Sequence, residues 1–162
     1  MRGARIDALR SALIALAGGQ GRIKFGGFAV FRERETVSLL GYSDKPRRPQ
    51  AFTIPAGGSR KVLADIRGAV RDLGSGGNTA TYSALKAAYR LAVKQTAAHA
   101  GALTTIVVMT DGETNRGITA AQFRANYRSL PRAARAVPTF TVKFGSADAK
   151  SLDAGPGSPA AS

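Results

Sequence analysis

An apolar segment that ends in an acidic loop is the feature that most constrains how this chain can fold. Ile106 to Met109 is a continuous apolar run, β-branched at three of its four positions, which is typical of a strand covered on both faces of a parallel sheet. Thr110-Asp111-Gly112-Glu113 follows at once. A carboxylate just beyond the C-terminal end of such a strand lies where open α/β sheets bind ligands. Asp111 is therefore the first candidate functional residue.

Composition excludes several classes of site. The chain has 162 residues, which is the length of one domain, with no cysteine and a single histidine, His99. Disulfides and thiolate metal sites are therefore excluded, and a histidine-based zinc site or a Ser/His/Asp triad is disfavoured. No apolar run approaches the roughly 18 residues of a membrane span, and the N-terminus has no signal-peptide pattern. The sequence does not indicate a compartment.

The net charge of +14, from 24 basic and ten acidic residues, raises the hypothesis of binding to nucleic acid or an anionic surface. The basic residues are spread along the whole chain, however, and aromatic residues are not interleaved with them as in single-strand binders. One basic cluster, with spacings of four, four and three, would form a single solvated stripe on a helix. We favour a solvated surface and keep this cluster as a candidate anion-binding set: Arg124, Arg128, Arg132 and Arg135.

Predicted helices and strands largely alternate along the chain. We expect residues 42–58 to form a Pro/Gly/basic loop, and the two strands before it to pair as an antiparallel hairpin. The order predicts a three-layer α/β/α sandwich of Rossmann-like type, with a mainly parallel sheet and one antiparallel edge strand. The expected strands are Ile23–Phe31, Thr36–Leu40, Ile106–Thr110 and Thr139–Phe144. The expected helices are 6–16, 59–73, 80–98 and 119–130. In the second of these helices we expect Ser59 as N-cap and an inward-facing stripe of Val62, Ile66, Val70 and Leu73.

Two loops share the same chemistry. Gly76–Thr79, before a predicted helix, and Thr110–Glu113, after a predicted strand, offer oxygen donors of the kind that suits Mg²⁺ or Mn²⁺. No Lys-Ser/Thr follows the first loop, so it is not a P-loop. A hydrolase with Asp111 as nucleophile lacks an acid/base partner other than Glu113. On local pattern alone, a helix N-cap is the favoured interpretation of Thr79, and a turn residue is the lesser alternative for Asp111.

Both loops resemble motifs of the von Willebrand factor A-type (vWA) family, whose fold is shared by integrin inserted domains. Gly77–Leu85 is similar to the family's Gly-x-Thr-x-x-Tyr-x-Ala-Leu signature, and Val108–Glu113 resembles its Thr-Asp-Gly strand end. Residues 144–152 resemble the last strand and following helix of bacterial members. The resemblance implies a vWA-like domain over residues 1–152, and we expect the Gly/Pro/Ala/Ser tail at 153–162 to be disordered.

The resemblance implies a metal-ion-dependent adhesion site. In the family, an Asp-x-Ser-x-Ser loop, a threonine and the Asp of Thr-Asp-Gly hold a divalent cation, and a carboxylate of the partner completes the metal shell. This implies Thr79 and Asp111 as ligands of Mg²⁺ or Mn²⁺, with Asn78, Gly112 and Glu113 around them. It also implies a non-enzymatic protein-interaction module whose partner presents an acidic side chain.

The first ligand loop of that site is missing from the sequence. No Asp-x-Ser-x-Ser occurs in the 162 residues, and the chain begins Met1-Arg2-Gly3-Ala4-Arg5, which resembles the part of the family pattern that follows this loop. We therefore interpret the chain as N-terminally truncated, without the first central strand, and expect weak metal binding and low stability. The alternative function is electrostatic binding of nucleic acid or anionic surfaces through the arginines; a metal-dependent hydrolase ranks third.

Overall fold

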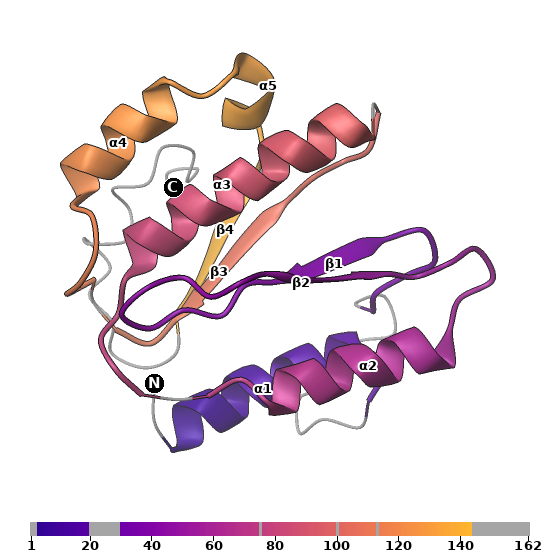
Figure 1. Ribbon diagram of the computed structural model, residues 1–162. Helices are drawn as coiled ribbons and strands as arrows, with labels where there is room; N and C mark the ends of the chain where they lie inside the picture. Colours follow the sequence, from indigo (N-terminus) through magenta and orange to yellow (C-terminus); the bar gives the residue numbers. More distant parts are fainter. Residues whose placement is uncertain (1–2, 20–29, 75, 100, 113, 144–162) are drawn as a thin grey trace, which may run out of the picture. The chain divides into compact units, whose positions relative to one another are not determined.

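The chain forms two compact units. The computed structural model describes residues 3–19, 30–74, 76–99, 101–112 and 114–143 (Figure 1). The first unit comprises residues 1–41 and 48–76, and the second comprises residues 42–47 and 77–162. Within the described ranges, no helix combines the length and the apolar character needed to cross a bilayer.

The first unit pairs two short strands and packs two helices together. Strands β1 and β2 are antiparallel, with Thr36 opposite Thr53 and Leu39 opposite Gln50. The prediction of a loop at 42–58 is wrong for β2. Three of the four residues of β2 are exposed and only Phe52 is partly buried, so its sequence carries almost no apolar alternation. The elements are α1 (Ala4–Leu16), β1 (Thr36–Leu39), β2 (Gln50–Thr53) and α2 (Arg60–Arg71).

The core of the first unit is aliphatic. Helix α2 begins where the Ser59 hydroxyl accepts a hydrogen bond from the Val62 amide at 3.2 Å, as the sequence predicts. Its inward stripe is also confirmed: Ile66 and Val70 are fully buried, and Val62 and Leu73 pack partly buried against them. Most of the first strand of the predicted hairpin, Ile23–Phe31, lies outside the described residues.

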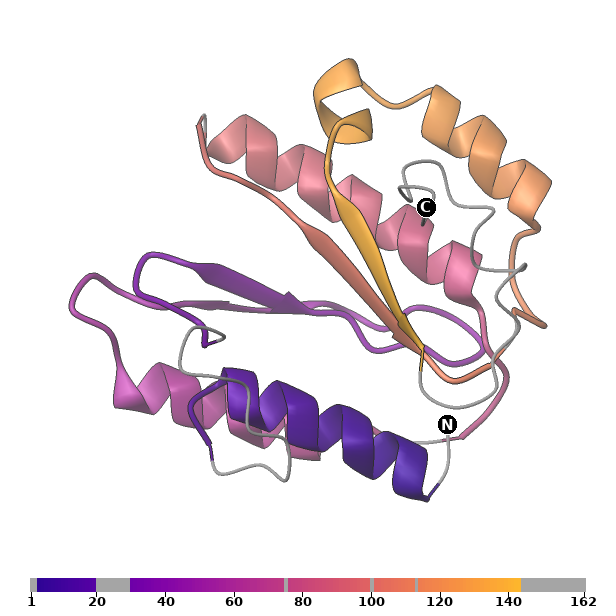
Figure 2. The same ribbon diagram turned by 180° about the vertical axis from the view of Figure 1, so that it is seen from behind.

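The second unit contains a parallel strand pair. Strands β3 and β4 run in the same direction, with Ile106 opposite Thr139 and Thr110 opposite Lys143. The chain between them crosses over through two helices, and the pair lies along α3 in both views (Figures 1 and 2). Parallel pairing with helical crossovers is as the sequence predicts. The elements are α3 (Thr81–Ala98), β3 (Ile106–Thr110), α4 (Ala120–Arg128), α5 (Arg132–Arg135) and β4 (Thr139–Lys143).

The core of the second unit is aromatic. The rings of Tyr82 and Phe123 stack with centroids 5.7 Å apart, and Tyr89 meets Tyr127 edge-on at 5.2 Å. Phe123 is 2% exposed and lies at the centre of this group. Helix α4 is positioned by a capping box, in which Thr119 and Gln122 exchange hydrogen bonds. These contacts anchor the helices on which the loops of the candidate site are built.

One face of the β3–β4 pair is exposed in the structure. Val107, Phe140 and Val142 are 51%, 53% and 38% exposed, whereas Ile106 and Val108 on the other face are each 8% exposed. The prediction that Ile106–Met109 is covered on both faces is therefore wrong over the described residues. A continuous apolar run supplies two apolar faces, and among the described residues it is the face toward α3 that is buried.

The arginine cluster does not form a single helical stripe. Helix α4 ends at Arg128, and Pro131 precedes α5, so the cluster is divided between two helices. Proline has no amide hydrogen and cannot continue a helix. The prediction of one stripe rested on the 4-4-3 spacing of the arginines and left out this effect of Pro131. Arg124, Arg128, Arg132 and Arg135 are all exposed, as predicted.

Candidate metal centre

The loop that follows β3 is shaped by Thr110. This residue is 2% exposed, and its hydroxyl donates to the Gly112 carbonyl at 3.2 Å and lies 3.4 Å from the Gly112 amide. A threonine that bonds the backbone two residues on closes a tight turn. Asp111 therefore lies at the tip of that turn, partly exposed, at the carboxyl end of β3, a strand with one buried face.

The loop before α3 meets this turn. A Cβ built on Gly112 would lie 3.5 Å from the Thr79 hydroxyl oxygen. The two loops that the sequence singles out are thus in contact, although they lie more than 30 residues apart in the chain. Because Gly112 has no side chain, the Thr79 hydroxyl can approach the backbone next to Asp111 without an intervening methyl group.

Thr79 does not cap α3. The N-cap of this helix is Ala80, which makes no side-chain capping bond, so the N-cap interpretation of Thr79 is wrong. The backbone of Thr79 is held by Asn115 instead: the Thr79 amide donates to Asn115 Oδ1 at 2.7 Å, and the Asn115 amide donates to the Thr79 carbonyl at 3.0 Å. The loop after β3 therefore holds Thr79 through both its backbone N–H and its backbone C=O.

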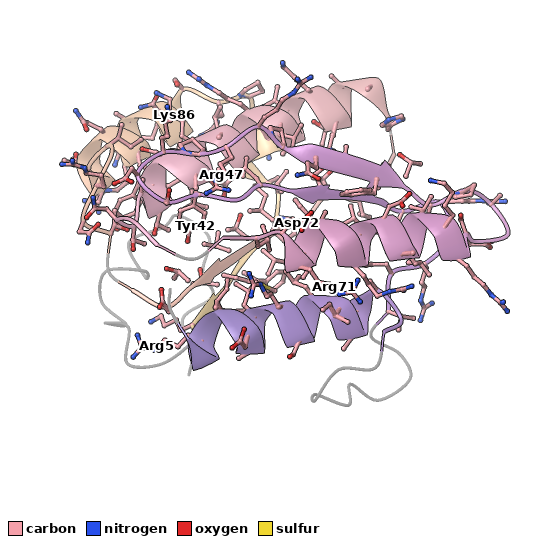
Figure 3. The ribbon with its side chains drawn as sticks, turned by 60° about the horizontal axis from the view of Figure 1, so that its bottom comes forward. Arg5, Tyr42, Arg47, Arg71, Asp72 and Lys86 are labelled. Carbon is pink, nitrogen blue, oxygen red and sulfur yellow. The ribbon has the colours of Figure 1, made fainter. Side chains whose placement is uncertain are left out.

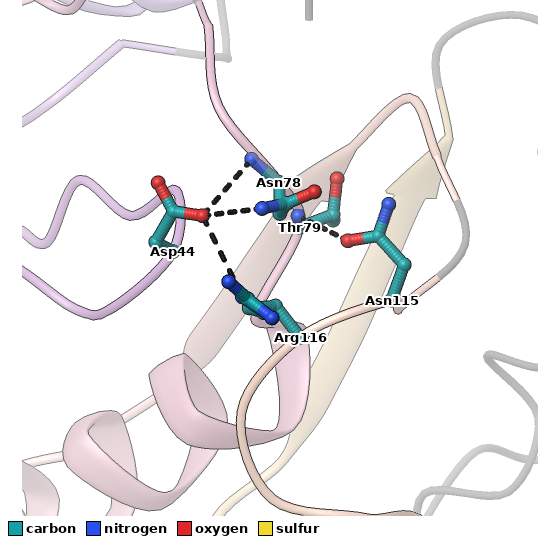
Figure 4. Close-up of polar contacts among 5 residues, drawn as sticks. All are labelled: Asp44, Asn78, Thr79, Asn115 and Arg116. Atoms are coloured by element: carbon teal, nitrogen blue, oxygen red, sulfur yellow. Dashed lines mark hydrogen bonds and ion pairs between the residues drawn. The ribbon is translucent and has the colours of Figure 1, made fainter.

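Asp44 holds the residue before Thr79. Its Oδ1 accepts hydrogen bonds from the Asn78 side-chain amide at 2.6 Å and from the Asn78 backbone amide at 3.4 Å, and Arg116 Nε lies 3.9 Å away (Figure 4). The hydrogen bonds from Asn78, aided by the charge of Arg116, hold the pKa of Asp44 below its ordinary value. Asn78, predicted to lie at the rim of the site, thus serves as the anchor of the loop.

Tyr42 contacts the end of β3 from the same chain segment. Its hydroxyl donates to the Met109 carbonyl at 3.2 Å. Burial raises the pKa of Tyr42, the side chains of Thr110 and Thr81 act in the opposite direction, and the charge of Asp111 adds to the increase. The Tyr42 hydroxyl therefore lies beside the end of β3 and the first residue of α3.

Sequence reasoning missed four residues of this network: Tyr42, Asp44, Asn115 and Arg116. Tyr42 and Asp44 lie in the segment predicted as a Pro/Gly/basic loop, and no periodic pattern distinguishes them. A weak signal was present, because Asp44 is the only acid between Glu35 and Asp65 and stands within a basic stretch. Figure 3 shows Tyr42 and Arg47 in this segment.

The donors present fit a cation that keeps most of its water. Thr79 and Asp111 supply a hydroxyl and a carboxylate, both hard oxygen donors, from two loops in contact. Over the described residues, no group of three or more His, Asp or Glu side chains gathers as metal ligands. Mg²⁺ commonly binds proteins through one or two carboxylates with several waters retained. Glu113 lies outside the described residues.

Residues 22–160 match the family model for the von Willebrand factor type A domain. The chain therefore belongs to the vWA family, which confirms both the resemblance carried by the two loops and the α/β, Rossmann-like fold class. Domains of this family are generally protein-interaction modules and often bind a divalent metal at a metal-ion-dependent adhesion site. A comparison with curated proteins gives no match.

Proposed function

We propose that this protein is a non-enzymatic interaction module that binds a partner through a divalent cation, with Thr79 and Asp111 among the ligands. The observation that supports the proposal most is the close approach of the Thr79 hydroxyl to Gly112. A Cβ built on Gly112 would lie 3.5 Å from the Thr79 hydroxyl oxygen. This approach brings into contact the two loops that carry a neutral and an anionic oxygen donor. Asn78 and Gly112 support the site through the loop contacts described above, and Glu113 remains a predicted neighbour.

The charge of such a site favours an acidic partner. A divalent cation bound by one carboxylate and one neutral hydroxyl keeps an uncompensated positive charge, which a carboxylate of the partner can neutralise. The net charge of +14 on the chain acts in the same direction, because it attracts acidic partners at long range. The bound cation would serve as the bridge between the two proteins.

With two ligands supplied by the described residues, we expect the site to bind Mg²⁺ or Mn²⁺ weakly. Mg²⁺ gives up its water reluctantly, and each additional protein ligand must offset that cost. No Asp-x-Ser-x-Ser segment in the sequence adds the remaining family ligands. A partner carboxylate would therefore contribute a large share of the stability of the metal-bound complex.

Titration with Mn²⁺, followed by electron paramagnetic resonance, tests this function directly. The wild-type chain should bind one Mn²⁺ competed by Mg²⁺, and both Asp111→Asn and Thr79→Val should abolish that binding. Asp65→Asn is the matched control, because it removes the same charge from an exposed helical position where Asp65 pairs with Lys61. Unchanged Mn²⁺ binding in Asp111→Asn would show the proposal to be wrong.

A second candidate function is electrostatic binding through the arginines of α4 and α5. These four side chains are exposed, and the carboxylates of the described residues form no ion pair with them. Binding of duplex DNA through these residues should weaken steeply as salt is raised and should be insensitive to EDTA. Binding of a polyglutamate peptide through the cation should be lost in EDTA. DNA binding that resists salt would count against the electrostatic function.

A further inference from the structure

Three consecutive residues, Tyr42–Asp44, contact both loops of the candidate site. Tyr42 bonds the carbonyl of Met109, two residues before Asp111. The Ser43 carbonyl accepts a hydrogen bond from the Ala80 amide at 2.9 Å. Asp44 accepts from the backbone and side chain of Asn78. All these residues belong to the second unit.

We propose that Tyr42–Asp44 is a positioning strut that sets the spacing between Thr79 and Asp111. The proposal rests on the function proposed above, and it assigns to the strut a role that neither ligand can fulfil. Two ligands on separate loops define a cation site only if the loops hold a constant separation. Groups that orient ligands in this way commonly affect metal affinity as much as some ligands do.

The contact with the 77–80 loop is close and encloses Thr79. The amides of Asn78 and Ala80, on either side of Thr79, both donate to the strut. Gly77 adopts φ +83°, and a Cβ there would lie 2.9 Å from Asp44 Oδ2 and 3.2 Å from Ser43 Cβ. Only glycine combines this backbone conformation with such a close approach. The loop is thus held against the strut by hydrogen bonds and by shape.

The contact with β3 is made by the hydroxyl of the partly buried Tyr42. Tyr42 donates to the Met109 carbonyl beside Thr110 and Thr81, which are 2% and 0% exposed. A hydrogen bond in such surroundings is costly to leave unmade. The strut is itself closed by a turn, in which the Ser43 amide donates to the Lys45 carbonyl and Tyr42 pairs with Pro46. Its two ends therefore move together.

A third contact closes the network. Asn115, from the loop after β3, holds Thr79 directly, and Arg116 lies beside Asp44. The strut, the 77–80 loop and the loop after β3 each contact the other two, so displacement of one changes the spacing of the others. The proposal assigns Asp44 a positioning role, because its Oδ1 accepts both hydrogen bonds from Asn78 and is approached by Arg116.

Amide hydrogen exchange without metal tests the strut separately from metal binding. Asp44→Ala should speed exchange at Asn78 and Ala80, and it should also do so at Gly112, which Asp44 does not contact. Tyr42→Phe removes the hydrogen bond between the strut and the Met109 carbonyl, and it should speed exchange at the same amides. Asp44→Asn keeps an acceptor oxygen and should restore slow exchange. The matched control, Asp65→Ala, removes an exposed carboxylate from α2 and should change none of these amides.

The outcomes are distinct for each proposal. If Asp44→Ala speeds exchange at Asn78 alone and leaves Gly112 unchanged, Asp44 merely secures its own loop and the strut is refuted. If the strut is correct, Mn²⁺ affinity should fall about 10- to 100-fold in Asp44→Ala, as for other groups that orient metal ligands. A wild-type chain that binds no Mn²⁺ would overturn the proposed function, while coupled exchange at Asn78 and Gly112 would still support the strut.

Discussion

The two units of the chain are stabilised in different ways. In the first, Ile54, Ile66 and Val70 form an aliphatic core between helix and strand, at most 1% exposed. In the second, three aromatic rings surround Phe123, and the loops are joined by side-chain hydrogen bonds that span long stretches of sequence. An apolar core requires only shape and burial. A polar site also requires that each donor meet a particular acceptor.

This contrast shows where the candidate site can be disturbed. Its loops are supported by the aromatic core through α3 and α4, and by hydrogen bonds among themselves. Substitutions in the core should act through the stability of the whole second unit. Substitutions in the loops should act locally, with smaller changes in the free energy of unfolding.

The largest effect should come from Phe123→Ala. Phe123 is 2% exposed and contacts Tyr82, Tyr89 and Tyr127, so truncation should lower the free energy of unfolding by about 3–5 kcal/mol. Phe52→Ala makes the same change in the first unit, on an otherwise exposed strand, and should cost less than about 2 kcal/mol because less area is uncovered. Urea unfolding measures both; equal losses would contradict the difference drawn between the two units.

An intermediate effect is expected for Gly117→Ala. Gly117 adopts φ +82°, and a Cβ there would overlap Ser83 Oγ and lie 3.2 Å from Ala80 Cβ. Ser83 Oγ also accepts a hydrogen bond from the Ile118 amide at 3.1 Å. The backbone strain alone should cost about 1–2 kcal/mol, and displacement of Ser83 should add to it.

Gly57→Ala is the matched control for the backbone term. Gly57, in the first unit, has φ +83°, and a Cβ there would meet nothing within 4 Å. Its substitution should therefore cost only the strain, about 1–2 kcal/mol. The difference in urea-unfolding free energy between the two variants measures how tightly the loop after β3 packs on α3. If Gly117→Ala is no more destabilising than Gly57→Ala, that packing is loose.

The parts of the fold that sequence predicts well are those with local signals. Helix α2 carries a serine cap and a four-residue apolar period, and β3 is a continuous apolar run; both are found where expected. Strand β2 has neither signal, since it is short and mostly exposed. The division of the arginine cluster depended on a single proline, whose local effect outweighed the regular charge spacing.

The residues of the candidate site also fall into those with a local sequence signal and those without one. Thr79 and Asp111 carry motifs, so their loops could be singled out from sequence, and the structure brings those loops into contact. Tyr42 and Asp44 could not be found, because their partners lie 67 and 34 positions away. No local pattern encodes contacts at that separation. Their role follows only from the folded arrangement of the three segments.

The smallest effect concerns the pH dependence of the loop contact at Asp44. Hydrogen bonds from Asn78 hold the pKa of this carboxyl below its ordinary value. A carboxyl with a lowered folded-state pKa contributes stability above its unfolded-state pKa, and this contribution is lost as the pH falls through the folded-state value. Protection of the Asn78 amide should therefore be constant from neutral pH down to about 4 and should decrease below that.

Exchange rates at Asn78, corrected for the intrinsic pH dependence of amide exchange, measure this contribution. In Asp44→Asn the acceptor oxygen cannot be protonated in this range, so the decrease in protection should disappear. The change should be slight even in the wild type, because Asp44 is exposed and solvent screens its charge. A decrease that persists in Asp44→Asn would mean that acid loosens the aromatic core of the second unit rather than the loop contact, and the division between core and loop stability would then have to be abandoned.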